Sequence, residues 1–313
     1  MDTNSPLSAV RPIERRFLRL KGPDATRYLQ GMLTADVAKA SAAASEAGRP
    51  AGGRAYLLDA KGKAKSEIVF LCLSKEEILL SLPAAQADGA ATALDAYIIA
   101  DDVQLEVLGE APYATIYRVP DSPFASIPTL APNVPDAKDR LAVVAEEAWG
   151  LRVRRTDFGD HDEEWWVRDA SQIPRHEGLD DAAWASLRIA RGVAEWGPDL
   201  GTDSLVLEFP VQDAISFHKG CYIGQEVVAR ATYRGKMTRG LCRFTASASL
   251  EVGYVHAENE PDKPVGKLTT VEGNKGLGLL RFAPLDAGSK LVQIRADGGR
   301  TLIENVEVLL GRE

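Results

Sequence analysis

The first hundred or so residues alternate between apolar and polar positions in a way that predicts strands with two helices among them. The tripeptide GPD at residues 22–24 favours a helix start, because proline suits the first helical position and an acid suits the first turn. A second helix is predicted over residues 84–100, despite Gly89. The predicted strands are RRFLRLK, GGRAYLLD, KAKSEIVFLCL, EEILLSLP, DDVQLEVLG and YATIYRVP, with Lys61-Gly62 as the turn between the second and third.

The middle of the chain is less regular. Five prolines between Pro120 and Pro135 predict a long loop or a subdomain edge, since proline disrupts regular elements. The segment RLAVVA predicts a strand, and GDHDEEWW predicts an acidic turn. The segment LDDAAWASLRIARG predicts a helix that Asp180 or Asp181 caps and Gly192 ends.

After Thr238 the pattern becomes one of short strands separated by turns. These are GLCRFTA, VGKLTTV, GLGLLRF, LVQIRA and ENVEVLL. About five strands in so short a stretch predict a small antiparallel barrel or sandwich. The whole chain is therefore predicted to be α+β. Residues 1–237 are expected to form two subdomains that divide near residues 119–138, and residues 238–313 a C-terminal β-barrel.

Composition narrows the class of protein. The chain has 313 residues, with 45% hydrophobic and 26% charged residues, which is ordinary for a soluble protein. No run approaches the length of a membrane span, and the N-terminus lacks the apolar core of a signal peptide. Three cysteines without a CxxC pair indicate free thiols in a reducing compartment. A cytoplasmic protein with no membrane partner is predicted.

Charge is unevenly distributed. The net charge of −8 makes a general nucleic-acid-binding role unfavourable. Residues 211–243 nevertheless carry an excess of basic side chains, with Lys219, Arg230 and Arg234 among them. This local excess indicates either an anion site or a solvated face of the protein, and charge alone does not separate the two.

The stretch HKGCYIGQEVVAR at residues 218–230 carries the strongest chemical signal. Cys221 follows His218 and Lys219 and precedes a helix expected to begin near Gly224, and both nearby cations and a helix start favour a thiolate. The alternative is a small, packed, unreactive cysteine. The H-x-x-C spacing supplies only half of a zinc site, and no paired motif supplies the rest, so no metal site is predicted.

This stretch resembles the signature of the YgfZ-type proteins, folate-binding relatives of the glycine-cleavage T-protein (aminomethyltransferase) that act in iron–sulfur protein maturation. The family pattern is Lys-Gly-Cys-aromatic-x-Gly-Gln-Glu, then three residues, then Arg. The matching residues are Lys219, Gly220, Cys221, Tyr222, Gly224, Gln225, Glu226 and Arg230. Further segments, including LKGPDATRYLQGMLTADV and LVLEFPVQDAISFHKG, extend the resemblance over nearly the whole chain.

The resemblance implies a ring of domains around a folate-sized opening. It also implies departures from the T-protein itself. The stretch LRIARG has Ala190 where the T-protein has an acid that holds the pterin, and Gln225 stands where it has a basic residue. Glu67 is the nearest counterpart of an aspartate in its first subdomain. These differences argue against aminomethyl transfer.

A bound folate requires a carboxylate for the pterin and cations for its glutamate tail. The candidates are Glu67 and Glu208 for the pterin and Lys219, Arg230 and Arg234 for the tail, with Tyr222, Gln225 and Glu226 as further contacts. Cys221 is the candidate functional thiol, with Lys219 and Arg230 beside it, and one thiolate could serve as a transient cluster ligand.

The predicted function is that of a tetrahydrofolate-dependent accessory factor for assembly or repair of iron–sulfur proteins, mainly [4Fe–4S] proteins, rather than an ordinary enzyme. Its expected partners are the assembly machinery or client enzymes. One alternative is a tetrahydrofolate-dependent aminomethyl or one-carbon transferase, and another is an interaction module whose folate site is vestigial.

Overall fold

The computed structural model describes residues 8–108, 114–119, 142–143, 145–147, 150–154, 163–168, 171, 176–211, 213–233, 237–295 and 297–310. These form two compact units, which are described separately. The first contains the described residues between 8 and 179 and between 211 and 227. The second contains those between 180 and 210 and between 228 and 310.

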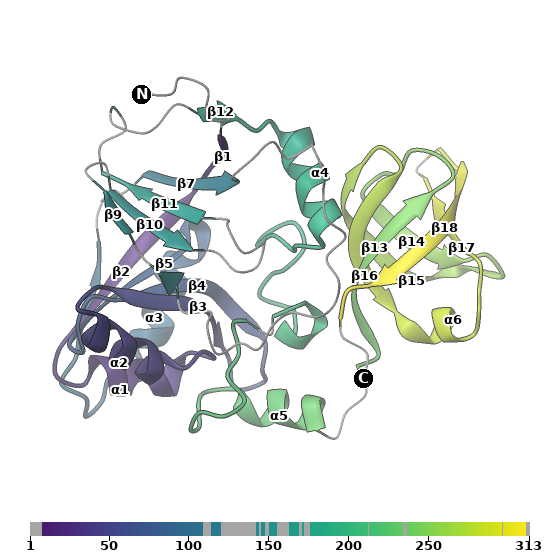
Figure 1. The fold of residues 1–313 in the computed structure, drawn as a ribbon. Coiled ribbons are helices and arrows are strands. Elements are labelled where there is room, and N and C mark those ends of the chain that lie inside the picture. Colours follow the sequence, from purple (N-terminus) through teal and green to yellow (C-terminus); the bar gives the residue numbers. More distant parts are fainter. Residues whose placement is uncertain are drawn as a thin grey trace. The chain divides into compact units, whose positions relative to one another are not determined.

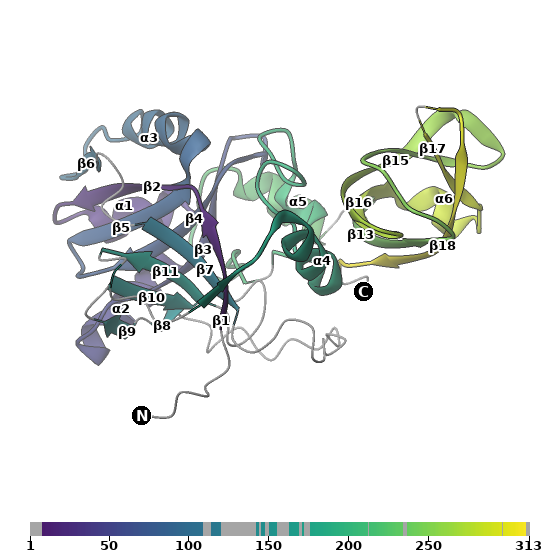
Figure 2. The same ribbon diagram turned by 90° about the horizontal axis from the view of Figure 1, so that it is seen from above.

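Two six-stranded sheets form the first unit (Figures 1 and 2). The first sheet is antiparallel, in the order β6 (Gln104–Val107), β2 (Arg15–Lys21), β5 (Glu77–Pro83), β4 (Ala64–Cys72), β3 (Ala51–Leu58) and β8 (Ala142–Val143). The second has the order β12 (His176–Gly178), β1 (Ser8–Ile13), β7 (Ala114–Val119), β11 (Glu163–Val167), β10 (Gly150–Arg154) and β9 (Ala145–Glu147). In the second sheet only β1 and β12 pair in parallel among the described strands.

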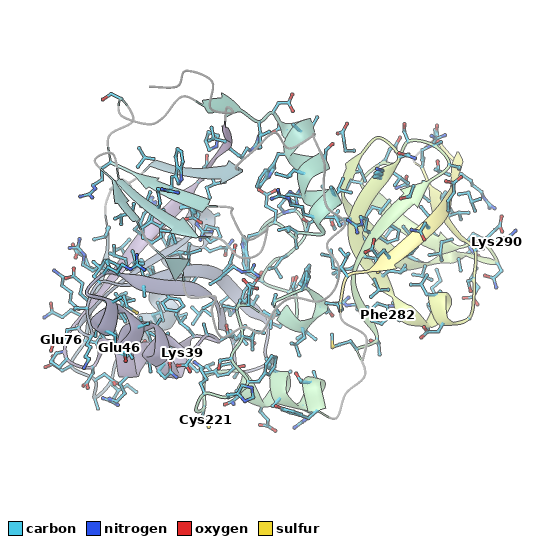
Figure 3. All side chains as sticks on the ribbon, viewed as in Figure 1. Lys39, Glu46, Glu76, Cys221, Phe282 and Lys290 are labelled. Carbon is cyan, nitrogen blue, oxygen red and sulfur yellow. The ribbon has the colours of Figure 1, made fainter. Side chains whose placement is uncertain are left out.

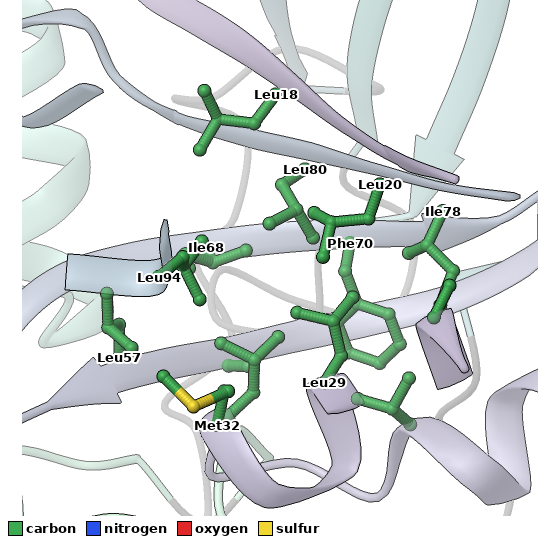
Figure 4. Close-up of a cluster of buried hydrophobic side chains, with 14 of the residues drawn as sticks. Leu18, Leu20, Leu29, Met32, Leu57, Ile68, Phe70, Ile78, Leu80 and Leu94 are labelled. Atoms are coloured by element: carbon green, nitrogen blue, oxygen red, sulfur yellow. The ribbon is translucent and has the colours of Figure 1, made fainter. Parts of the chain in front are cut away.

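Both faces of the first sheet are covered. Successive side chains of a strand point to opposite faces, so each central strand supplies buried side chains to both layers. One face packs against α1 (Ala25–Met32), α2 (Val37–Ala47) and α3 (Ala87–Asp95), which follows a short 3₁₀ turn, η1 (Ala84–Gln86). Figure 4 shows Leu18, Phe70 and Leu80 among the apolar side chains that fill this layer. The other face packs against the second sheet, where the rings of Phe17 and Trp166 meet edge to face with centroids 4.9 Å apart.

The second unit contains a closed barrel of six antiparallel strands (Figure 1, yellow and light green). They are β13 (Arg239–Ala246), β14 (Gly253–Ala257), β15 (Glu260–Glu272), β16 (Lys275–Arg281), β17 (Leu291–Ile294) and β18 (Arg300–Val308), with α6 (Phe282–Asp286) after β16. The unit also holds α4 (Asp181–Arg191) and η4 (Val206–Glu208). Helix α5 (Gln225–Tyr233) follows the motif cysteine.

Most predicted elements are confirmed, and the α+β class with a C-terminal antiparallel barrel is correct. Helix α4 begins and ends as expected, since the Asp180 carboxylate accepts the Ala183 N–H at 2.8 Å and Gly192 is left-handed with φ of 70°. The domain boundaries stay a prediction, and residues 120–138 lie outside the described part of the chain.

Four expectations were wrong or incomplete. The helix predicted over residues 84–100 is shorter, since α3 spans only Ala87–Asp95 after the 3₁₀ turn η1. No element was predicted for α2, whose Asp36 cap accepts the Lys39 N–H at 3.1 Å. The tryptophans of GDHDEEWW lie in strand β11 rather than in a turn, because the neighbouring Glu164 is buried and accepts hydrogen bonds from Ser81 and Trp166. The barrel has a sixth strand, β14, which the pattern did not reveal.

Candidate functional site

Cys221 lies at the exposed apex of a loop that runs from Asp213 to the start of α5 (Figure 3). Gly220 and His218 are exposed beside it, whereas Lys219 and Tyr222 on either side are buried. The same short stretch therefore combines an accessible thiol with side chains that anchor it to the first unit.

The Lys219 side chain is one of these anchors. Its ammonium donates hydrogen bonds to three backbone carbonyls, those of Gln30 at 2.6 Å, Ala35 at 2.9 Å and Leu33. These carbonyls belong to the last turn of α1 and the turn that follows it. The ammonium also lies 4.7 Å from the centre of the Tyr222 ring, a cation–π distance. Lys219 was expected to act on the thiol or on a folate tail, and both roles stay predictions.

Burial affects the ionisation of both side chains. It lowers the pKa of Lys219 to about 8, and the nearby Asp36 carboxylate opposes that shift. It raises the pKa of Tyr222 to about 12. Three carbonyl acceptors match the three donors of an ammonium, so the protonated form of Lys219 gives each of these three carbonyls, called here the carbonyl ring, a hydrogen bond.

Thr34 connects the loop to the first sheet. Its hydroxyl donates to the Ala214 carbonyl at 2.6 Å and accepts the Tyr56 N–H at 2.8 Å. Its backbone carbonyl accepts the Ser216 N–H at 2.9 Å, and its own N–H donates to the Tyr56 carbonyl at 3.0 Å. A fully buried threonine thus holds the loop, β3 and the α1–α2 turn together.

The loop is fixed again after the cysteine. The Ile223 N–H donates to the Gly31 carbonyl at 3.2 Å. The sequence predicts that Gly220 and Gly224 allow positive φ or close backbone approach. This is confirmed at Gly224, which has φ of 81° and where a Cβ would lie 2.6 Å from the Asp59 carbonyl oxygen. It is wrong for Gly220, which has no positive φ and around which a Cβ would meet nothing within 4 Å.

The remaining motif residues lie in α5, which begins at Gln225 as expected. The Gln225 side-chain oxygen accepts the Tyr222 N–H at 3.3 Å, so this residue closes the turn into the helix. Glu226 and Arg230 are exposed and four residues apart on α5, and both make interactions with other groups. Their proposed contacts with folate stay predictions.

Glu67, the first pterin candidate, belongs to a buried charged network on the first sheet. Its carboxylate lies 3.7 Å from the guanidinium groups of both Arg15 and Arg54. Arg54 in turn donates two hydrogen bonds to Asp213, at 3.0 and 2.6 Å, and so links the sheet to the start of the motif loop. A buried charge needs such partners, because its desolvation is costly.

Glu208, the second pterin candidate, lies in the second unit. It occupies the 3₁₀ helix η4 and is buried. Arg239 donates to both of its carboxylate oxygens, at 2.6 and 3.0 Å. This bidentate pair ties η4 to the first residue of β13. Arg234, a candidate for the folate tail, lies outside the described residues.

Other kinds of site were searched within the described ranges. No group of three or more His, Cys, Asp or Glu side chains there is arranged to hold a metal ion. Nor does that part of the chain contain a helix with the length and apolarity to cross a membrane.

Sequence reasoning missed Thr34, Arg54 and Asp213, the residues whose hydrogen bonds connect the loop to the first sheet. Thr34 carries no signal in the sequence, because an isolated threonine after an apolar run is unremarkable. Arg54 does carry one: it stands within the otherwise apolar strand AGGRAYLL, where a charge requires a buried partner. That partner, Asp213, lies 159 residues away and cannot be deduced from spacing.

The fold defines the class of protein. The solved structure of glycine cleavage system aminomethyltransferase T from Bartonella henselae matches with a TM-score of 0.71 and 15% identity, over 96% of this chain and 85% of that one. The family model of the CAF17 C-terminal beta-barrel domain matches residues 238–307. This is an aminomethyltransferase-like fold that carries a CAF17-type barrel.

The curated relatives identify the family. The chain is 32% identical to the tRNA-modifying protein YgfZ of Sodalis glossinidius, over 78% of this chain and 73% of that protein. It is 28% identical to the mitochondrial iron-sulfur cluster assembly factor IBA57 homolog of Pyricularia oryzae, over 86% of this chain and 70% of that protein. The chain belongs to the YgfZ family, as its motif had indicated.

Proposed function

We propose that this protein is an accessory factor for the assembly or repair of iron–sulfur proteins, mainly [4Fe–4S] proteins, and that it acts through the Cys221 thiol. The observation that carries the proposal is an exposed cysteine between two anchors, the buried Lys219 and the partly buried Ile223-Gly224. A thiolate is both a nucleophile and a ligand for iron. The name of the IBA57 relative, an iron-sulfur cluster assembly factor, supports the same role.

We also propose that the protein binds a reduced folate, a carrier of one-carbon units. The carboxylate of Glu67 fits this chemistry, because it is buried on the first sheet and an ionised carboxylate accepts hydrogen bonds. It would accept N–H groups of the pterin. Lys219 fits a folate tail less well, because its three donors already have carbonyl acceptors. Exposed Arg230 is the better cation for the tail.

The alternative is a one-carbon or aminomethyl transferase. The aminomethyltransferase-like fold favours it, but two residues do not. Ala190 lies in α4 and has no side-chain group to hold a pterin, and Gln225 uses its side-chain oxygen to accept the Tyr222 N–H. Complementation of a strain that lacks the T-protein would favour this alternative.

Direct action on nucleic acid is a third reading, prompted by the name of the YgfZ relative. The net charge of −8 is unfavourable for binding a phosphate backbone. We therefore propose the cluster-assembly machinery or its clients as partners, in the cytoplasm, and expect the protein to influence RNA only through enzymes that carry clusters.

The proposal is tested by deleting the gene and assaying a panel of cluster-dependent enzymes beside cluster-independent ones. Only the former should lose activity, and the wild-type gene should restore it. Unchanged cluster enzymes would reject the assembly role. Calorimetric titration with tetrahydrofolate tests the ligand separately, and an absence of binding would leave a folate-independent factor.

A further inference from the structure

Three backbone carbonyls at the end of α1 converge on one point, and the Lys219 ammonium fills it. A helix ends with carbonyls that have no partner within the helix, and these carry the negative end of its dipole. The N–H that would normally bond the Gln30 carbonyl is that of Thr34, and it donates instead to Tyr56. The Gln30 oxygen accepts from Lys219 at 2.6 Å.

We infer that Lys219 is a positioning residue for the Cys221 thiol: by capping the end of α1, its ammonium fixes the loop that presents the cysteine. This inference rests on the proposed function, because it assumes that the thiol acts. One residue, Gly220, separates Lys219 from Cys221. The anchors at Ser216 and Ile223 hold the loop on either side, so the cap restrains the segment between them.

The three carbonyl acceptors around this point favour lysine over other residues. An ammonium brings three donors on a compact, flexible stem, whereas a guanidinium is a planar fork. The side chain is buried and packs beside the Tyr222 ring. An apolar side chain of similar length would leave the buried carbonyls without donors, and unpaired buried polar groups destabilise the conformation that contains them.

A purely electrostatic role for Lys219 leads to different expectations. If its charge acted on the thiol through space, removal would shift the pH profile of Cys221 alkylation and leave the loop as it is. If it positions the loop, removal should release the backbone hydrogen bonds on both sides of the cysteine. The amides of Ser216 and Ile223 report this directly, since both donate to carbonyls of the α1–α2 region.

Hydrogen exchange on Lys219→Met and Lys219→Ala tests the inference, with Lys39→Met as the control for loss of an exposed lysine on α2 (Figure 3). We expect the Ser216 and Ile223 amides to exchange about tenfold faster or more in both Lys219 variants, which corresponds to losing one or more buried hydrogen bonds. Amides of the β4–β5 ladder should be unchanged. Restoration of cluster enzymes should fall by a similar factor, and Lys39→Met should match the wild type.

Chemical rescue adds a readout that a mere packing role would not move. Methylammonium can return three N–H donors to the carbonyl ring of Lys219→Ala, whereas tetramethylammonium has none. Slow exchange should return with the first cation and not with the second at equal concentration. Should Lys219→Met fail to fold, Lys219→Ala prepared in methylammonium and transferred to tetramethylammonium makes the same measurement.

One result overturns the inference: Ser216 and Ile223 amides that exchange at the wild-type rate in both Lys219 variants, whether or not the pH profile of Cys221 alkylation shifts. A failure of the inference about Lys219 can be distinguished from a failure of the proposed function. Full activity of a Cys221→Ala protein would remove the functional thiol, whereas the exchange measurement still decides whether Lys219 holds the loop.

Discussion

Cys72 and Cys221 are the same side chain in opposite surroundings within the first unit. Cys72 ends strand β4, is completely buried in the layer between the first sheet and its helices, and has no exposed surface. Cys221 is exposed, on a loop in which Lys219 and Tyr222 are buried. In β4 nearly every side chain is buried, whereas in the loop buried Lys219 and Tyr222 anchor a stretch in which His218, Gly220 and Cys221 are exposed. The difference shows that several residues of a sequence motif can serve to hold its one reactive group in place.

The largest difference between the two cysteines should appear in their alkylation. Burial raises the pKa of Cys72 to about 12, so below that pH its thiol is protonated, and at pH 8 only about one part in ten thousand is thiolate. Cys221, being exposed, should react with iodoacetamide at least a thousandfold faster at pH 8. Mass spectrometry of labelled peptides over time measures both rates in one sample.

Unfolding supplies the control for that experiment. In denaturant the two cysteines should label at similar rates, because the surroundings that distinguish them are lost. Equal labelling of the native protein would mean that Cys221 is protected or that the layer around Cys72 opens readily.

The two glycines of the motif, Gly220 and Gly224, allow the exposed part of the loop to be compared with the part that is held in place. Gly224→Ala should cost about 1–3 kcal/mol of unfolding free energy, since the residue has φ of 81° and an added Cβ would lie 2.6 Å from a backbone oxygen. Gly220→Ala, with open space around it, should change stability by less than about 0.5 kcal/mol. Urea denaturation of the two variants gives both values. Similar losses at the two positions would contradict a loop that is anchored after the cysteine and open at it.

The smallest expected effect is on stability when each cysteine is truncated. Cys72→Ala removes a buried sulfur from a packed layer and should cost about 1 kcal/mol or somewhat more. Cys221→Ala should lie within about 0.5 kcal/mol of the wild type, because an exposed thiol contributes little packing. Thermal unfolding monitored by circular dichroism compares them. A larger loss at Cys221 would indicate that its side chain packs.

The sequence predicted those parts of the molecule that depend on local pattern. Both ends of helix α4 were predicted from its capping residues. The β3–β4 hairpin and five barrel strands were predicted from alternation and turn residues. The candidate site was found because its residues are consecutive in the motif. The supports of the site were not found, since Thr34 and Asp213 act through contacts between segments far apart in the sequence. The hydrogen-bond partners of Lys219 were missed for the same reason: its sequence neighbour is the thiol, but those partners lie 184 to 189 residues away.

The central claim is that Cys221 acts and the surrounding motif presents it. The most direct measurement is the activity of cluster-dependent enzymes in a deletion strain that carries either Cys221→Ala or Cys72→Ala, with both proteins confirmed to be folded and present in equal amounts. The account predicts that Cys221→Ala restores no more than the empty vector and that Cys72→Ala restores nearly as much as the wild type. Full restoration by Cys221→Ala would contradict it.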